Sequence, residues 1–65
     1  MIKNKVRFFR EQKGLSQTEL AEKAEISPDM LRLIEKYIYT PPIAIAEKIS
    51  NILGVQILIL YESGD

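Results

Sequence analysis

Enzyme chemistry requires a nucleophile or a general base, and few side chains of this sequence can supply one. The 65 residues include neither histidine nor cysteine, which excludes imidazole bases, thiolate nucleophiles, disulfides and the commonest nitrogen and sulfur ligands of metals. A serine nucleophile would need a lysine or a carboxylate as its base, and Ser16 and Ser27 are explained better as helix caps. No glycine-rich phosphate loop is present. We therefore expect no enzyme activity, no cofactor and no metal site.

Ser16 and Ser27 each stand where a helix should begin. Ser16 and Glu19 make the S-x-x-E pattern of a capping box, in which each side chain binds a backbone N–H of the first turn. Ser27 precedes Pro28, which suits the first helical position because its missing N–H is not needed there. These starts predict one helix at about 16–24 and a second at about 27–36. Helices joined so tightly must cross steeply, as in a helix-turn-helix.

The charges of the chain cancel overall but are unevenly distributed. Residues 1–13 contain five basic side chains and one acidic side chain, whereas residues 17–35 contain five acidic and two basic ones. A nucleic-acid-binding protein usually has a basic surface. Here only the first predicted helix supplies one, which weakens the case for tight DNA binding without removing it.

Three further elements complete the expected domain. Apolar spacing predicts a helix over residues 2–13, ended by Gly14. After Pro41 and Pro42, which no helix can cross easily, a helix is expected from residue 43 until Gly54 ends it. The segment 56–61 is uniformly apolar and reads either as a short strand or as a last helix.

The whole chain, residues 1–65, reads as a single small domain. It has no apolar run of about 18 residues that could span a membrane. Its N-terminus lacks the apolar segment of a signal peptide. We therefore expect a cytoplasmic protein that does not enter a membrane.

The motif GLSQTELAEKAEIS and the later LIEKYIYTPPIAIAEKISNILGV together resemble the phage repressor and Cro-like domains, the XRE-type helix-turn-helix family. The resemblance covers roughly residues 4–61. It implies an all-α, compact lambda-repressor-like domain of five helices. It also implies double-stranded DNA as the ligand, with the second helix across the DNA backbone and the third in the major groove.

The family resemblance assigns roles to individual positions. Gln17 matches a residue that binds a backbone phosphate at a helix N-terminus. Arg10 and Glu35 match a structural ion pair between the first and third helices. The positions that would contact DNA on or beside the third helix are Ser27, Pro28, Asp29, Met30, Arg32, Leu33, Lys36 and Tyr39.

The sequence departs from the family at both ends of the third helix. Glu25 and Tyr37 occupy positions where the family usually has glycine, and a side chain in the left-handed region costs roughly 1 kcal/mol. Either the chain absorbs this strain, or the third helix continues through Tyr37 towards Thr40. Among the base-reading positions, Asp29 repels phosphates and Leu33 can contact only a thymine methyl.

Two functions fit these observations. The first is a repressor-like, sequence-specific transcriptional regulator that binds a two-fold operator as a homodimer. The alternative is a helix-turn-helix scaffold that has lost or weakened DNA reading and binds a protein partner through its apolar surface, as an antitoxin-like or altered variant. In the first case the dimer interface is expected at Ile57, Leu58, Ile59 and Tyr61, where apolar residues replace an acidic pair of the family.

Overall fold

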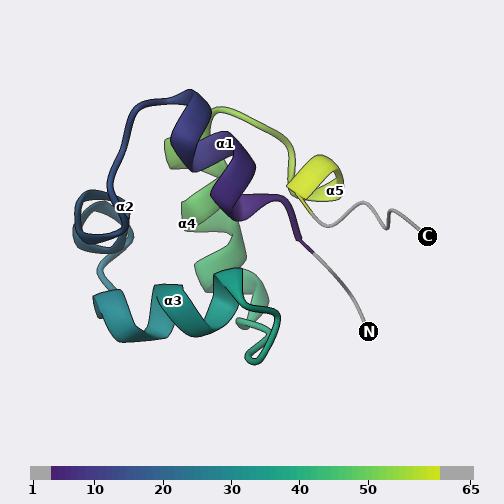
Figure 1. The fold of residues 1–65 in the computed structure, drawn as a ribbon. Coiled ribbons are helices and arrows are strands. Elements are labelled where there is room, and N and C mark those ends of the chain that lie inside the picture. Colours follow the sequence, from purple (N-terminus) through teal and green to yellow (C-terminus); the bar gives the residue numbers. More distant parts are fainter. Residues whose placement is uncertain (1–3, 61–65) are drawn as a thin grey trace.

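The computed structural model describes residues 4–60, and every regular element among them is helical. Four helices of seven to eleven residues are followed by a single helical turn. Figure 1 shows their arrangement; their bounds are α1 Val6–Gln12, α2 Gln17–Ala24, α3 Pro28–Glu35, α4 Ile43–Leu53 and α5 Ile57–Leu60. The segment 57–60 is therefore not a strand. None of the helices within residues 4–60 has the length and apolarity needed to cross a bilayer.

The expected count of five helices is not supported, because α5 is only one turn long. Its backbone hydrogen bond runs from the N–H of Leu60 to the carbonyl of Gln56 at 3.2 Å. One bond of this kind does not offset the entropy lost in fixing a first helical turn. Leu60 is fully buried, so this turn is stabilised by packing rather than by its own helical propensity.

The core lies where the helices meet around α4. Figure 1 shows α1 in front of α4, with α2 to the left, α3 along the bottom and α5 beside the start of α1. α2 packs against both α3 and α4, and α1 contacts α3 and α4. Burying one such aliphatic side chain contributes about 1.5–3 kcal/mol. The largest fully buried side chains are Leu20, Leu31, Ile34, Ile49, Leu60 and Val6.

The first helix begins later than the apolar spacing predicts. It spans residues 6–12 rather than 2–13, and residues 1–3 lie outside the described part of the chain. The reason is Asn4, whose Nδ2 donates to the carbonyl of Ile34 at 2.8 Å while its Oδ1 accepts from the N–H of Val6 at 3.0 Å. The Lys5 N–H donates to the carbonyl of Leu60 at 2.7 Å. These long-range bonds hold residues 4 and 5 out of the helix.

All four longer helices end with the same backbone motif. After each, one N–H reaches back three residues and the next N–H reaches back five, the two bonds of a Schellman motif. The residue at the turn has a positive φ, which favours glycine. Gly14 (φ 75°) and Gly54 (φ 72°) meet this requirement, whereas Glu25 (φ 61°) and Tyr37 (φ 65°) carry side chains there.

The end of α3 decides between the two alternatives left by the sequence. α3 stops at Glu35, and the N–H of Ile38 returns to the carbonyl of Leu33 at 3.0 Å. The continuation of this helix towards Thr40 is therefore wrong. Tyr37 adopts the left-handed conformation and accepts its cost of roughly 1 kcal/mol. The chain turns back sharply after α3 for this reason.

Candidate nucleic-acid interface

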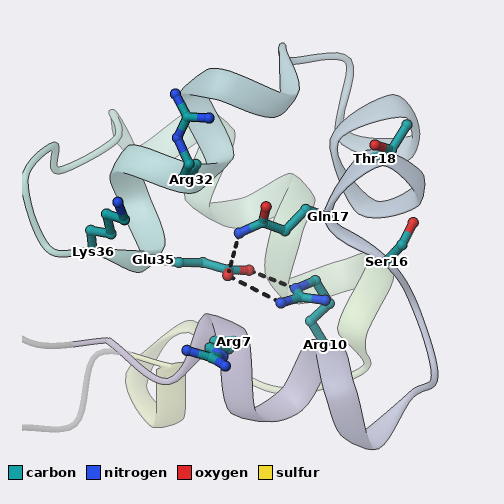
Figure 2. Close-up of a pocket in the computed structure, with 8 residues that line it drawn as sticks. All are labelled: Arg7, Arg10, Ser16, Gln17, Thr18, Arg32, Glu35 and Lys36. Atoms are coloured by element: carbon teal, nitrogen blue, oxygen red, sulfur yellow. Dashed lines mark hydrogen bonds and ion pairs between the residues drawn. The ribbon is translucent and has the colours of Figure 1, made fainter.

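A buried carboxylate joins the first three helices. Arg10 of α1 donates from Nε to Glu35 Oε2 at 2.7 Å and from Nη2 to Oε1 at 3.2 Å (Figure 2). Gln17 of α2 donates from Nε2 to the same Oε1 at 3.0 Å, and Arg10 Nη1 donates to the carbonyl of Leu15 at 2.8 Å. The side chains of Arg10 and Glu35 are only 10% and 4% exposed. The network therefore fixes how α3 sits relative to the start of α2.

The N-terminus of α2 has a capping box. The Ser16 hydroxyl accepts from the N–H of Glu19 at 3.0 Å, and Glu19 Oε1 accepts from the N–H of Ser16 at 2.8 Å. Both bonds to Ser16, the backbone one first, hold the pKa of Glu19 below its usual value. The capping box expected from the sequence is confirmed. Gln17 follows immediately, and its amide nitrogen carries a second N–H beyond the one directed at Glu35.

A hollow of about 590 Å³ opens between α1, the start of α2 and α3. Figure 2 shows cationic side chains around it: Arg7 from α1, Arg32 from α3, and Lys36 from the C-cap of α3. Glu35, the one carboxylate among the described residues of its lining, is already neutralised by Arg10. Arg7 and Arg32 also make ion pairs, with Glu11 and Asp29, but these pairs are solvent-exposed and screen their charges only weakly. The hollow therefore presents cationic groups beside a helix N-terminus, which suits an anion such as a phosphate. Arg7 and Thr18 line it too, although neither residue was expected at the site from the sequence.

The outer face of α3 carries the remaining expected contacts. Arg32 Nη2 lies 3.1 Å from Asp29 Oδ1, with side chains that are 52% and 80% exposed. Pro28 at the first helical position is exposed, and Ser27 caps the helix by accepting from the N–H of Met30 at 3.0 Å. Ser27 and Pro28 are thus used to start the helix, while Asp29 and Arg32 face solvent.

Beside these polar groups, the same helix has an apolar flank. A second hollow, of about 380 Å³, is lined by Met30, Leu33 and Tyr39, with Ser27 and Asp29 also in its lining. The N–H of Tyr39 donates to the carbonyl of Leu33 at 3.3 Å, so the tyrosine lies close to the helix. The structure therefore separates the expected DNA-contact residues into two groups: Arg32 and Lys36 at the cationic hollow, and Met30, Leu33 and Tyr39 at the apolar one.

The α3–α4 loop is unusually apolar for an exposed segment. Ile38 is 69% exposed, and Tyr37, Tyr39 and Ile43 are exposed as well. Ile38 and Ile43 have most of their surface in solvent, whereas Tyr37 and Tyr39 are mostly covered. They extend the apolar flank of α3 into the loop, and a contiguous exposed apolar surface marks a contact site.

The turn between α2 and α3 is held by an ion pair to α4. Lys48 Nζ donates to Glu25 Oε1 at 2.8 Å, and both side chains are about half exposed or more. The hydrogen bond from Lys48, followed by its charge, lowers the pKa of Glu25. This pair stabilises a left-handed residue at the position where the helix-turn-helix bends.

The expected dimer segment is described only in part. Leu60 is fully buried and Ile57 is half-buried. The side chains of Leu58 and Ile59 are not described, and Tyr61 lies outside the described residues. One end of this segment thus closes the core of the domain. No cluster of three potential acidic, histidine or cysteine metal ligands occurs within residues 4–60.

Comparison with known proteins places this geometry in a family. The sequence model described as "Helix-turn-helix" matches residues 6–60. The transcriptional regulator SinR of Bacillus licheniformis is 38% identical over 66 residues, which take in all of this chain and 60% of SinR. The chain therefore spans less than two thirds of that relative. An uncharacterised helix-turn-helix transcriptional regulator of Methanocaldococcus jannaschii is 35% identical and covers 98% of this chain and 100% of its own length.

A solved structure supports the same grouping. The crystal structure of SinR, the master regulator for biofilm formation, in complex with DNA aligns with a TM-score of 0.75 and 38% identity. The alignment covers 80% of this chain and 84% of that one. The relatives that share this arrangement of helices are thus regulators of transcription, and one of them has been crystallised on DNA.

Proposed function

This chain belongs to the XRE-type helix-turn-helix family, and from that premise we propose that it is a transcriptional regulator that binds a DNA operator. In this proposal α3 enters the major groove, while the start of α2 and the cationic hollow lie against the phosphate backbone. Two copies of the chain bind the two halves of a two-fold operator. DNA occupancy then controls transcription without any catalytic step.

The observation that carries the proposal is the cationic hollow. Arg7, Arg32 and Lys36 line this hollow together with the start of α2. Arg10 already neutralises Glu35 there, and the ion pairs that Arg7 and Arg32 make within their own helices are solvent-exposed and therefore weak. Cationic side chains beside a helix start favour a phosphate. This local charge explains how a chain with no net charge can bind a polyanion.

Fluorescence anisotropy with the DNA segment upstream of the chain's own coding sequence tests DNA binding. We expect the logarithm of the affinity to fall linearly with the logarithm of the salt concentration, because phosphate contacts release counterions. Lys36→Gln should weaken binding and reduce the slope by about 1 for each protomer. Lys13→Gln is the matched control. Lys13 is the C-cap of α1 and does not line the cationic hollow, so this variant should change neither the affinity nor the slope. A flat salt response with every promoter fragment would exclude the regulator function.

The homodimer is proposed to form through the segment 57–61. Its support is the sequence, which is apolar from Ile57 to Tyr61, and the half-buried Ile57. Sedimentation of the double variant Leu58→Glu, Ile59→Glu should give the mass of one chain, against two for the parent. Leu60 is left unchanged in this experiment because its burial supports the fold. An unchanged mass would reject the segment as the interface.

One observation favours a second function, binding of a protein partner. Ile38 is 69% exposed and Ile43 is 65% exposed, and Asp29 places a carboxylate on the outer face of α3. A helix-turn-helix scaffold without DNA reading would use this apolar surface for a protein. In that case no DNA fragment would bind, and substitution of Ile38 by a charged residue would abolish partner binding.

A further inference from the structure

The buried carboxylate of Glu35 has a second partner besides Arg10. Its Oε1 accepts from Arg10 Nη2 at 3.2 Å and from Gln17 Nε2 at 3.0 Å. Pairing with Arg10 is enough to neutralise Glu35, so the bond to Gln17 calls for a separate explanation. Gln17 is half-buried and lines the cationic hollow. Its amide therefore lies where an anion in the hollow would bind.

The chemistry of the pair fixes which end of the Gln17 amide faces Glu35. A carboxylate that is paired with an arginine can only accept hydrogen bonds, so the amide must direct its NH2 group, and not its carbonyl, towards it. Figure 2 shows the nitrogen of Gln17 on the side of Glu35. One N–H of Nε2 is used in this bond, and the second N–H remains for an acceptor in the hollow, such as a phosphate oxygen.

The support under the Gln17 amide is itself held in place. Arg10 Nε donates to Glu35 Oε2 at 2.7 Å, and Arg10 Nη1 donates to the carbonyl of Leu15 at 2.8 Å. Leu15 lies just before the start of α2, so these hydrogen bonds form a closed circuit from Leu15 through α1 and α3 back to Gln17. Arg10 and Glu35 are almost fully buried, which keeps water from competing for the bonds. The amide is thus ordered before any ligand arrives.

Resting on the proposed function, we propose that Glu35 is a positioning residue for DNA binding, which holds the Gln17 amide so that its second N–H donates to an operator phosphate. Glu35 acts through Gln17 and has no contact with DNA of its own. A glutamine side chain has several rotatable bonds, and ordering such a side chain when DNA binds would cost roughly threefold to tenfold in affinity. Glu35 removes this cost because the side chain is already ordered in the folded domain.

Nuclear magnetic resonance relaxation of the side-chain amides tests the proposal in the free protein. Gln12 and Gln56 are exposed and serve as references within the same chain. We expect the heteronuclear NOE of Gln17 Nε2 to be close to the values of the helical backbone amides, and the values for Gln12 and Gln56 to be well below them. A Gln17 amide as mobile as the two references would overturn the positioning role and leave the regulator function standing.

A double variant then removes the support. Substitution of Glu35 alone would leave Arg10 buried without a counter-charge, so Arg10→Met is combined with Glu35→Leu. Replacing a buried ion pair by apolar side chains is often neutral or stabilising, and a urea transition checks the fold. In this variant the Gln17 amide should become as mobile as the references, and the DNA affinity should fall roughly threefold to tenfold.

Gln17→Ala, made in both backgrounds, separates positioning from a general effect on the fold. It should weaken DNA binding roughly tenfold in the parent, because it removes a hydrogen bond to a charged group, but at most about threefold in the double variant. Lys36→Gln is the matched control: Lys36 lines the same hollow, and the variant should weaken binding by the same factor in both backgrounds.

The outcomes separate this proposal from the proposed function. Equal losses from Gln17→Ala in the two backgrounds would overturn the positioning role, because Gln17 would then bind DNA independently of Glu35, and the regulator function would stand. Failure of the parent protein to bind any DNA fragment would overturn both.

Discussion

The two faces of α3 differ sharply, although they alternate along one eight-residue helix. The inner face is buried and includes Leu31, Ile34 and the ion-paired Glu35. The outer face includes Arg32 and Leu33, both exposed. The inner residues therefore hold the fold together, while the outer residues determine which surface the helix presents to solvent. A chain can therefore keep the buried residues that hold the family's fold and still present a different outer surface on α3.

The largest expected difference in the free energy of unfolding is between variants of two adjacent residues, Glu35 and Lys36. Glu35→Gln leaves the Arg10 cation buried without its counter-charge, so we expect the free energy of unfolding to fall by about 3–5 kcal/mol. Lys36→Gln, on the outer face, should change it by less than about 0.5 kcal/mol. Urea denaturation monitored by circular dichroism measures both. Similar losses in the two variants would contradict the division into faces.

The second largest difference in the free energy of unfolding is expected between variants of Ile34 and Leu33. Ile34 is fully buried, and Ile34→Ala should lower the free energy of unfolding by about 2–5 kcal/mol because it leaves a cavity. Leu33→Ala removes a side chain that is 38% exposed and should cost clearly less. The same urea transitions provide the test. A larger loss for Leu33→Ala would mean that the apolar flank belongs to the core rather than to a binding surface.

A smaller effect is expected where the outer face continues into the loop. Tyr37→Gly relieves a left-handed side chain and should raise the free energy of unfolding by about 1 kcal/mol. Gly14→Ala provides the reverse control: an added Cβ would meet no atom within 4 Å, so the cost comes from its φ of 75° alone. Stabilisation by the first variant together with weaker DNA binding would link the strain at Tyr37 to the surface it shapes.

The smallest effect concerns the pH dependence of the ion pair between Glu25 and Lys48. The pKa of Glu25 is lowered by Lys48 in the folded state, so this contribution to stability is present above the unfolded pKa and is lost as the pH falls through the folded one. The parent should therefore lose slightly more stability than Lys48→Met in urea transitions between neutral pH and about pH 3. Parallel curves for the two proteins would show that the pair adds nothing, as for many exposed pairs.

Local signals in the sequence predicted many of the helix starts and ends. The caps at Ser16 and Ser27 give the starts of α2 and α3 to within a residue, and Gly14 and Gly54 follow α1 and α4 closely. These signals work because a cap acts through hydrogen bonds within a few residues. The start of α1 was predicted wrongly because Asn4 binds the distant carbonyl of Ile34.

The binding surface could be predicted only in outline. Its residues were named from the family resemblance, yet their division between a cationic and an apolar hollow depends on how α1 and the loop fold against α3. Arg7 was missed because nothing in its own neighbourhood marks it as a contact. The route of the loop depends on Tyr37, for which the sequence allowed two conformations, and only the tertiary structure decides between them.

The hydrogen bond from the Lys5 N–H to the carbonyl of Leu60 has a consequence for protein synthesis. It joins the two ends of the described chain, and Leu60 also fills part of the core. A growing chain that has reached only Leu53 contains all four longer helices but lacks this closing contact. The packing that Leu60 provides can therefore form only after residue 60 has left the ribosome.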